Sequence, residues 1–108
     1  MKITLKEPAL EYLHTWTYPQ GLALRIDAVL SGGCGCTYDI HLTLDQIKET
    51  DRVVEQGGIP ICMNEQAILY MGDELTLQYQ PGSGFTLYSP SEILGTKLSI
   101  KQGTTIHD

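Results

Sequence analysis

The sequence predicts one compact, mainly β (α+β) domain with two short helices. Apolar and polar residues alternate over 22–30, 38–44 and 75–79, which is the two-residue period of half-buried strands. With 108 residues, 42% of them hydrophobic, the chain can bury one modest core. We expect residues 1–101 to form this core domain and residues 102–108 to form a flexible tail.

The N-terminal half is predicted to contain a strand, a helix and two long strands. Residues 2–5 alternate like a short strand, and Pro8 suits the first turn of a helix over 8–17, because its missing N–H needs no partner there. The alternating segments 22–30 and 38–44 follow as strands. These two strands flank a segment rich in glycine and cysteine.

The C-terminal half is predicted to be strands with one further helix. Gly57-Gly58 marks a hairpin turn, and Pro60 suggests an edge strand after it, since proline cannot donate to a ladder. Asn64 is a candidate N-cap for a helix over 65–71 that Gly72 would end. Further strands are expected at 75–79, 85–87 and 96–101. The expected total is seven or eight strands.

The charge and the apolar pattern argue against several functional classes. A net charge of −6 and a pI near 4.8 are unlike a nucleic-acid-binding surface, and the seven basic residues are scattered rather than grouped for an anionic membrane. Residues 1–7 lack the apolar region of a signal peptide, and no apolar stretch is long enough to span a membrane. We therefore expect a cytoplasmic protein. No catalytic triad order, carboxylate pair or phosphate loop is recognisable, so we expect no enzymatic activity.

The segment 31–37, Ser-Gly-Gly-Cys-Gly-Cys-Thr, carries the chemistry. Glycine lets the backbone approach a metal–thiolate centre closely and turn its N–H groups toward sulphur. Thiolates suit iron–sulphur clusters, Zn(II) and Cu(I) better than they suit hard cations. We therefore predict Cys34 and Cys36 as metal ligands, with Gly33 and Gly35 as backbone contacts to the cofactor, in a loop at one end of a sheet.

Other interpretations of these thiols stay open. One chain offers two closely spaced cysteines, whereas a 2Fe–2S cluster normally takes four protein ligands. A symmetric homodimer would supply four thiolates. Alternatively, the loop is a tight turn with incidental thiols on a scaffold without a cofactor. A third interpretation is a strained, easily reduced disulfide between Cys34 and Cys36, although His41 is the only basic residue close after them.

The third cysteine and the histidines are expected to be structural. Cys62 lies between an isoleucine and a methionine and is predicted to be a small buried hydrophobe. His41 is expected on the solvated face of its strand rather than as a ligand or proton donor. His14 is expected on the exposed side of the first helix, and His107 in the tail.

The order of elements resembles the HesB-like (IscA-like, A-type) iron–sulphur cluster carrier family. The resemblance spans residues 1–94 and rests on the opening helix, on Gly32-Gly33-Cys34, on the hairpin that leads into the second helix, and on Gly82-Ser83-Gly84-Phe85 with Ser89-Pro90 after it. It implies the HesB-like fold, a compact and distorted barrel-like β-sandwich. It also implies a role in iron–sulphur cluster biogenesis.

The resemblance further implies three cysteine ligands, one after the paired glycines and two in a C-terminal Cys-Gly-Cys. Cys34 occupies the first position, but residues 91–100, where the pair would fall, contain no cysteine. Cys36, which is not part of the family pattern, is the candidate replacement. We therefore expect an accessory or carrier protein that binds iron or an iron–sulphur cluster through Cys34 and Cys36, across a homodimer, and that meets assembly or client proteins. The alternative is a metal-free interaction module on the same scaffold.

Overall fold

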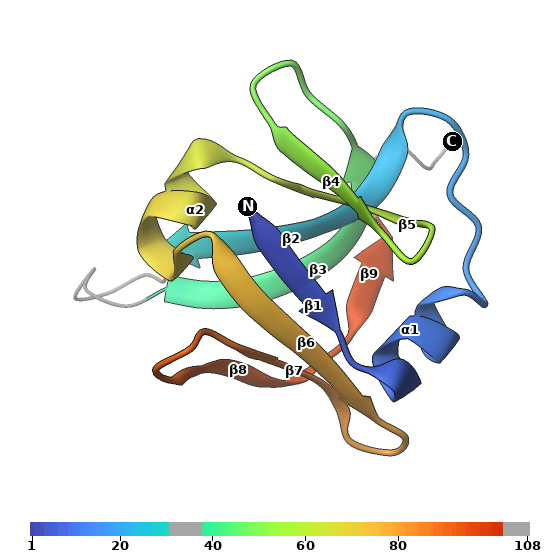
Figure 1. Ribbon diagram of the computed structural model, residues 1–108. Coiled ribbons are helices and arrows are strands. Elements are labelled where there is room, and N and C mark those ends of the chain that lie inside the picture. The colour runs from blue at the N-terminus through green and yellow to red at the C-terminus, as the bar shows by residue number, and fades with distance from the viewer. Residues whose placement is uncertain (31–37, 103–108) are drawn as a thin grey trace.

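The computed structural model describes residues 1–30 and 38–102, which form two β-sheets packed face to face with a helix at each end (Figure 1). The first sheet has the order β1 (Lys2–Leu5), β6 (Glu74–Gln80), β7 (Gly84–Tyr88) and β8 (Ile93–Leu98). The second has the order β4 (Arg52–Gln56), β5 (Ile59–Met63), β2 (Leu22–Leu30), β3 (Tyr38–Gln46) and β9 (Ile100–Gln102). The helices are α1 (Glu7–Leu13) and α2 (Glu65–Met71). The mainly β class, the sandwich and the two short helices are confirmed, although the sheets are not closed into one barrel.

The hydrophobic core lies between the two sheets and is built from one face of each long strand. In β3 the buried residues Ile40, Leu42 and Leu44 alternate with exposed or half-buried ones, as the sequence predicts. Fully burying such a side chain stabilises the fold by about 1.5–3 kcal/mol. A slip of one residue would turn this whole row toward water, so the alternation determines the register.

The first helix ends earlier than the sequence predicts. α1 stops at Leu13 rather than at residue 17, and the chain tightens into turns in which the Thr15 hydroxyl donates to the Tyr12 carbonyl oxygen at 2.6 Å. The Tyr18 hydroxyl donates to the Leu13 carbonyl oxygen at 2.8 Å. Both bonds occupy carbonyls at the helix end, and Pro19 disfavours helical geometry at the residue before it. The prediction of a helix over 8–17 is therefore wrong in its last turn.

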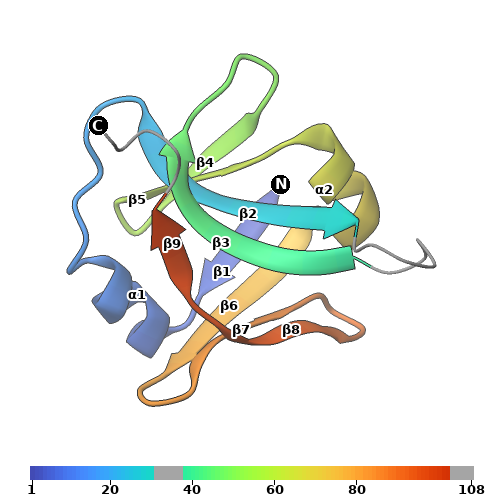
Figure 2. The ribbon, with the colours of Figure 1, turned by 180° about the vertical axis from the view of Figure 1, so that it is seen from behind.

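The second helix agrees with its predicted bounds. The Asn64 side chain accepts a hydrogen bond from the Ala67 backbone N–H at 2.8 Å, which satisfies one of the free donors of the first turn. Gly72 ends the helix with a φ of +86°, a conformation that side chains rarely allow. α2 contacts β2, and Figures 1 and 2 place it at the opposite end of the sandwich from α1.

The predicted edge position of Pro60 is wrong. β5 lies between β4 and β2, and β4 is the edge strand. The proline is tolerated because β2 pairs with β5 only at Leu24↔Ile61 and Arg25↔Cys62, so Pro60 has a strand partner on the β4 side alone.

The last predicted strand, 96–101, is two strands in two different sheets. β8 begins at Ile93 and ends at Leu98, and β9 begins at Ile100 in the other sheet. Lys97, within β8 and two residues before this crossing, adopts a φ of +55°. The described residues thus form nine strands rather than seven or eight. No helix in the described part of the chain is long and apolar enough to cross a membrane. The division into a core over 1–101 and a tail over 102–108 stays a prediction, because residues 103–108 are not described.

Candidate functional site

The strands on either side of the cysteine segment form one long antiparallel hairpin. β2 and β3 pair in unbroken register from Leu22↔Gln46 to Leu30↔Tyr38. Leu30 and Tyr38, the described residues on either side of the cysteine segment, therefore lie opposite each other at one end of the second sheet. Cys34, Cys36, Gly33 and Gly35 lie outside the described residues, so their assignment as ligands and backbone contacts stays a prediction.

Beside this end of the hairpin, α2 presents an apolar surface. The rings of Tyr38 and Tyr70 lie 4.1 Å apart between centroids, tilted by 33°. Together with Gln66 and Leu69 they line a hollow of about 460 Å³. Leu69 is 85% exposed and Tyr70 is 45% exposed. Exposed apolar side chains that gather in one place are typical of interaction surfaces.

A groove of about 390 Å³ begins at the same end and runs between β3 and β8. One wall is Tyr38 to His41 of β3, and the other is residues 94–99 of β8 and the link to β9, with Lys101 at the rim. The second wall belongs to the stretch 91–100, where the family pattern would place its missing cysteine pair. This wall therefore lies beside Tyr38, the first described residue after the cysteine segment.

His41 lies on the strand face away from the core, as predicted, whereas His14 is exposed as predicted but lies just after α1 rather than within it. His41 is half-buried, alternates with the core residues Ile40 and Leu42, and pairs across the hairpin with Asp27. His14 is exposed and its Nε2 donates to the Gly57 carbonyl oxygen at 2.8 Å, which ties the end of α1 to the β4–β5 turn. His107 lies outside the described residues.

Comparison of the sequence with known protein families identifies the family of this chain. A family model described as iron–sulphur cluster biosynthesis matches residues 1–102. The chain belongs to this family. The resemblance to HesB-like carriers is therefore confirmed, and so is the general assignment to iron–sulphur cluster biosynthesis. Among curated proteins, none matches the chain.

Solved structures share this fold. A candidate Fe–S biosynthesis protein from Lactobacillus acidophilus is 18% identical with a TM-score of 0.65, over 95% of this chain and 90% of that one. One from Lactobacillus salivarius is 21% identical with a TM-score of 0.68, over 94% and 98% of the two chains. Escherichia coli SufA, involved in biosynthesis of iron–sulphur clusters, is 18% identical with a TM-score of 0.69, over 84% and 82%. At these identities the likeness shows the fold.

The structure describes the third cysteine, Cys62, and this residue is fully buried. Burial raises the pKa of the Cys62 thiol to about 11, so this thiol is protonated at neutral pH and is a poor metal ligand. Its burial is confirmed, but its surroundings differ from those expected. Cys62 lies on the opposite face of β5 from Ile61 and Met63, next to Arg25 of β2.

Arg25 belongs to a buried ion cluster that sequence reasoning did not find. It is 4% exposed and binds both carboxylate oxygens of Asp51, at 3.0 Å from Nη1 and 2.7 Å from Nη2. Its Nε contacts Asp45 at 3.2 Å, and Nη2 also donates to the Gln46 carbonyl oxygen at 2.8 Å. The hydrogen bond from Arg25 holds the pKa of Asp51 below its ordinary value. The sequence signal for this cluster is Ala23, because a small apolar residue on the same face of the strand as Arg25 indicates that this face is packed as well.

Metal-binding side chains do not gather elsewhere in the described part. Within residues 1–30 and 38–102, no three side chains of histidine, cysteine, aspartate or glutamate are placed to hold a metal ion together.

Proposed function

We propose that this protein is a carrier or accessory factor of iron–sulphur cluster biogenesis that binds iron or a 2Fe–2S cluster through Cys34 and Cys36. The observation that carries the proposal is the closure of the β2–β3 hairpin at Leu30↔Tyr38. It returns both ends of the cysteine segment to one end of a rigid sheet. Membership of the iron–sulphur cluster biosynthesis family supplies the class of cargo.

The division of labour among the three thiols supports this assignment. Cys62 is buried and its pKa is raised to about 11, which leaves Cys34 and Cys36 as the thiols for a metal. Cysteine thiols bind iron as thiolates, so loading would release one proton from each thiol. Gly33 and Gly35 would place backbone N–H groups near the sulphurs without side-chain hindrance.

We infer a homodimer as the loaded state. Two cysteines per chain give four thiolates around a twofold axis, which is the usual protein ligand number for a 2Fe–2S cluster. The apolar surface formed by Tyr38, Leu69 and Tyr70 lies at the same end of the molecule and is suited to contact with an assembly or client protein. In this role the protein binds and hands over cargo, and does not catalyse a reaction. The compartment we propose is the cytoplasm.

The second candidate function is a metal-free interaction module on the same scaffold. The observation in its favour is that residues 91–100 contain no cysteine, although they line the groove beside the hairpin end. Under this alternative the exposed Leu69 and Tyr70 would be the functional residues, and the thiols would be incidental.

Anaerobic reconstitution with ferrous iron and sulphide separates the two functions. We expect a visible thiolate-to-iron absorption band in the wild type and in Cys62→Ala, and none in Cys34→Ser or Cys36→Ser. Cys62→Ala is the matched control, because it removes one thiol without touching the loop. A colourless wild-type protein without bound iron would support the metal-free module instead.

A further inference from the structure

The groove between β3 and β8 runs along a strand edge rather than across a sheet face. Successive residues of a strand point to opposite faces, so a hollow over one face meets every second residue. This groove is lined instead by four consecutive residues, Tyr38 to His41, and by six consecutive residues on the other wall, 94–99. Contact with consecutive residues is what an edge provides.

The edge of β3 is unpaired over these same four residues. β2 pairs with β3 along its whole length, but β9 pairs with the other edge only from Leu42 to Leu44. Figure 2 shows β9 beside one half of β3, with β8 running below the other half. Along an antiparallel strand, alternate residues direct their N–H and C=O groups to opposite sides. Within the described residues, half of the backbone groups of Tyr38 to His41 therefore face the groove without a strand partner.

From this geometry we propose that the β3–β8 groove binds an extended peptide segment of a partner protein by strand addition to β3, and that the segment alternates apolar and acidic residues. A strand rises about 3.3 Å per residue, so this four-residue edge is about 13 Å long. Main-chain hydrogen bonds supply the affinity in this mode of recognition, and alternate side chains supply the specificity.

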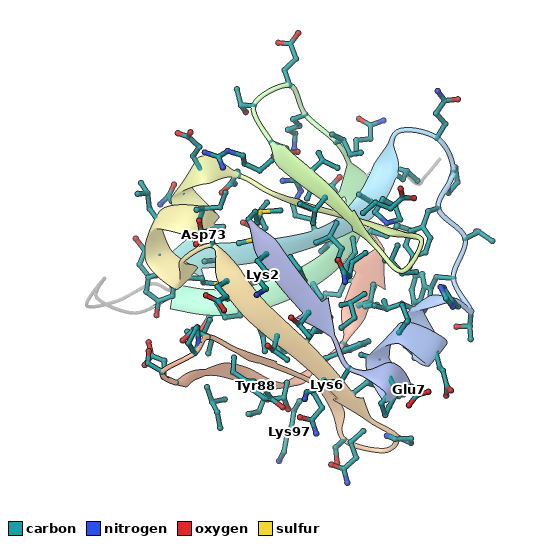
Figure 3. All side chains as sticks on the ribbon, viewed as in Figure 1. Lys2, Lys6, Glu7, Asp73, Tyr88 and Lys97 are labelled. Carbon is teal, nitrogen blue, oxygen red and sulfur yellow. The ribbon has the colours of Figure 1, made fainter. Side chains whose placement is uncertain are left out.

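The two rims of the groove define the peptide's side chains. On the core side, Gly95 already packs against Ile40, whereas Leu94 and Leu98 are half-buried, so apolar residues of the peptide would contact these two leucines. Lys97 and Lys101 are both exposed and line the groove, against one carboxylate, that of Asp39. Figure 3 shows the Lys97 side chain extending outward beside β7 and β8. On a chain with a net charge of −6, this local excess of lysine favours an acidic ligand.

A single segment fits this site better than a second copy of the chain. β8 bounds the groove along its length, and β9 ends it at Leu42, so a whole sheet edge would meet both strands before it reached β3. The site uses neither Cys34 nor Cys36 and does not rest on cluster binding.

The test uses a fluorescein-labelled heptapeptide, Glu-Val-Glu-Ile-Glu-Val-Gly, and the full-length protein, with binding followed by fluorescence anisotropy and by amide NMR shifts. We expect saturable binding with shifts that include the Tyr38 to His41 amides. Two further peptides are N-methylated at every second residue, in opposite phase. The one whose methyl groups replace the N–H donors that face the strand edge should not bind, and the other should. Replacing the three glutamates with lysine should weaken binding at least tenfold.

Two protein variants complete the test. Lys101→Glu should weaken peptide binding about tenfold and make it less dependent on salt. Arg52→Glu makes the same change of charge on the opposite edge strand and should bind like the wild type. The double variant Cys34→Ser/Cys36→Ser should also bind normally, which separates this site from the cluster. No binding by wild type, equal binding of both N-methylated peptides, or equal effects of Lys101→Glu and Arg52→Glu would overturn the proposal.

Discussion

Replacing Asp51 with alanine should destabilise the protein more than replacing Asp45, the other carboxylate that contacts Arg25. The Asp51 side chain is 1% exposed, receives two hydrogen bonds from Arg25 and accepts a third from the Lys48 backbone N–H at 2.7 Å. Its removal leaves the buried Arg25 guanidinium with Asp45 and one carbonyl as partners. A buried charge that loses its main partner is the costly case of ion-pair mutation.

The expected loss is about 3 kcal/mol. Breaking a buried ion pair from one side costs about 3–5 kcal/mol, and the lower end applies here because Arg25 keeps two other contacts. For a domain this small, with a urea m-value of about 1.5 kcal/mol/M, the unfolding midpoint should fall by about 2 M. Asp45→Ala is the matched control. Asp45 is 22% exposed and makes one contact with Arg25 at 3.2 Å, so its removal should cost about 1 kcal/mol.

Urea unfolding followed by circular dichroism measures both variants, together with Arg25→Met and the double variant Arg25→Met/Asp51→Ala. The double variant should be less destabilised than the sum of its two single changes, since the charges depend on each other. Equal losses for Asp51→Ala and Asp45→Ala, or strict additivity in the cycle, would refute the reasoning.

The remaining predictions concern pH, a turn and a helix cap. Because folding lowers the pKa of Asp51, the contribution of this carboxylate to stability is present above the ordinary pKa of aspartate and is lost as pH falls through the folded value. Wild type should therefore lose stability between pH 5 and pH 3 more steeply than Asp51→Asn. Urea midpoints that fall in parallel in the two proteins would contradict this. The pKa of Cys62 is raised, so the unfolded thiol ionises first and wild type should lose stability from about pH 8.5 upward. Cys62→Ala should lose less, because only the raised pKa of Tyr18 then acts near pH 10; equal losses between pH 7 and pH 10 in the two proteins would count against a buried thiol. Gly82 and Gly84 have φ of +85° and +98°, but only at Gly84 would an added Cβ meet backbone, the Leu98 carbonyl oxygen at 2.7 Å. Alanine at Gly82 should therefore lower the stability by about 1–2 kcal/mol, and alanine at Gly84 should lower it clearly more, which thermal melts can rank. The opposite order would contradict the close approach of Gly84 to Leu98. Asn64→Ala should cost about 1 kcal/mol by the loss of its bond to the Ala67 N–H, and an unchanged melting temperature would show that this cap is not formed.

Sequence periodicity could predict most of the elements because each depends on its own residues. The β2–β3 hairpin follows from two alternating rows, and α2 follows from Asn64 and Gly72. Side-chain hydrogen bonds at Tyr12 and Leu13 shorten α1, and such bonds carry no periodic signal. The split of the last strand at Ser99 depends on a crossing between sheets, which local pattern does not encode.

The candidate site divides in the same way. The cysteine segment was visible as a motif, and its flanking strands could be predicted from alternation. The groove could not, since it forms only where 38–41 and 94–99 meet through different sheets. The Arg25 cluster could not be predicted either, because Asp45 and Asp51 lie 20 and 26 positions from Arg25 in the chain. Tertiary contacts of this kind need the fold before they can be identified.

Native mass spectrometry of anaerobically reconstituted protein tests the central claim most directly. If Cys34 and Cys36 hold a 2Fe–2S cluster across a homodimer, the wild-type spectrum should show a dimer carrying two irons and two sulphides, about one of each per chain. Cys62→Ala should give the same species, and Cys34→Ser/Cys36→Ser should give chains without added mass. A wild-type spectrum of cofactor-free chains under these conditions, or the same iron content in Cys34→Ser/Cys36→Ser as in wild type, would contradict the account.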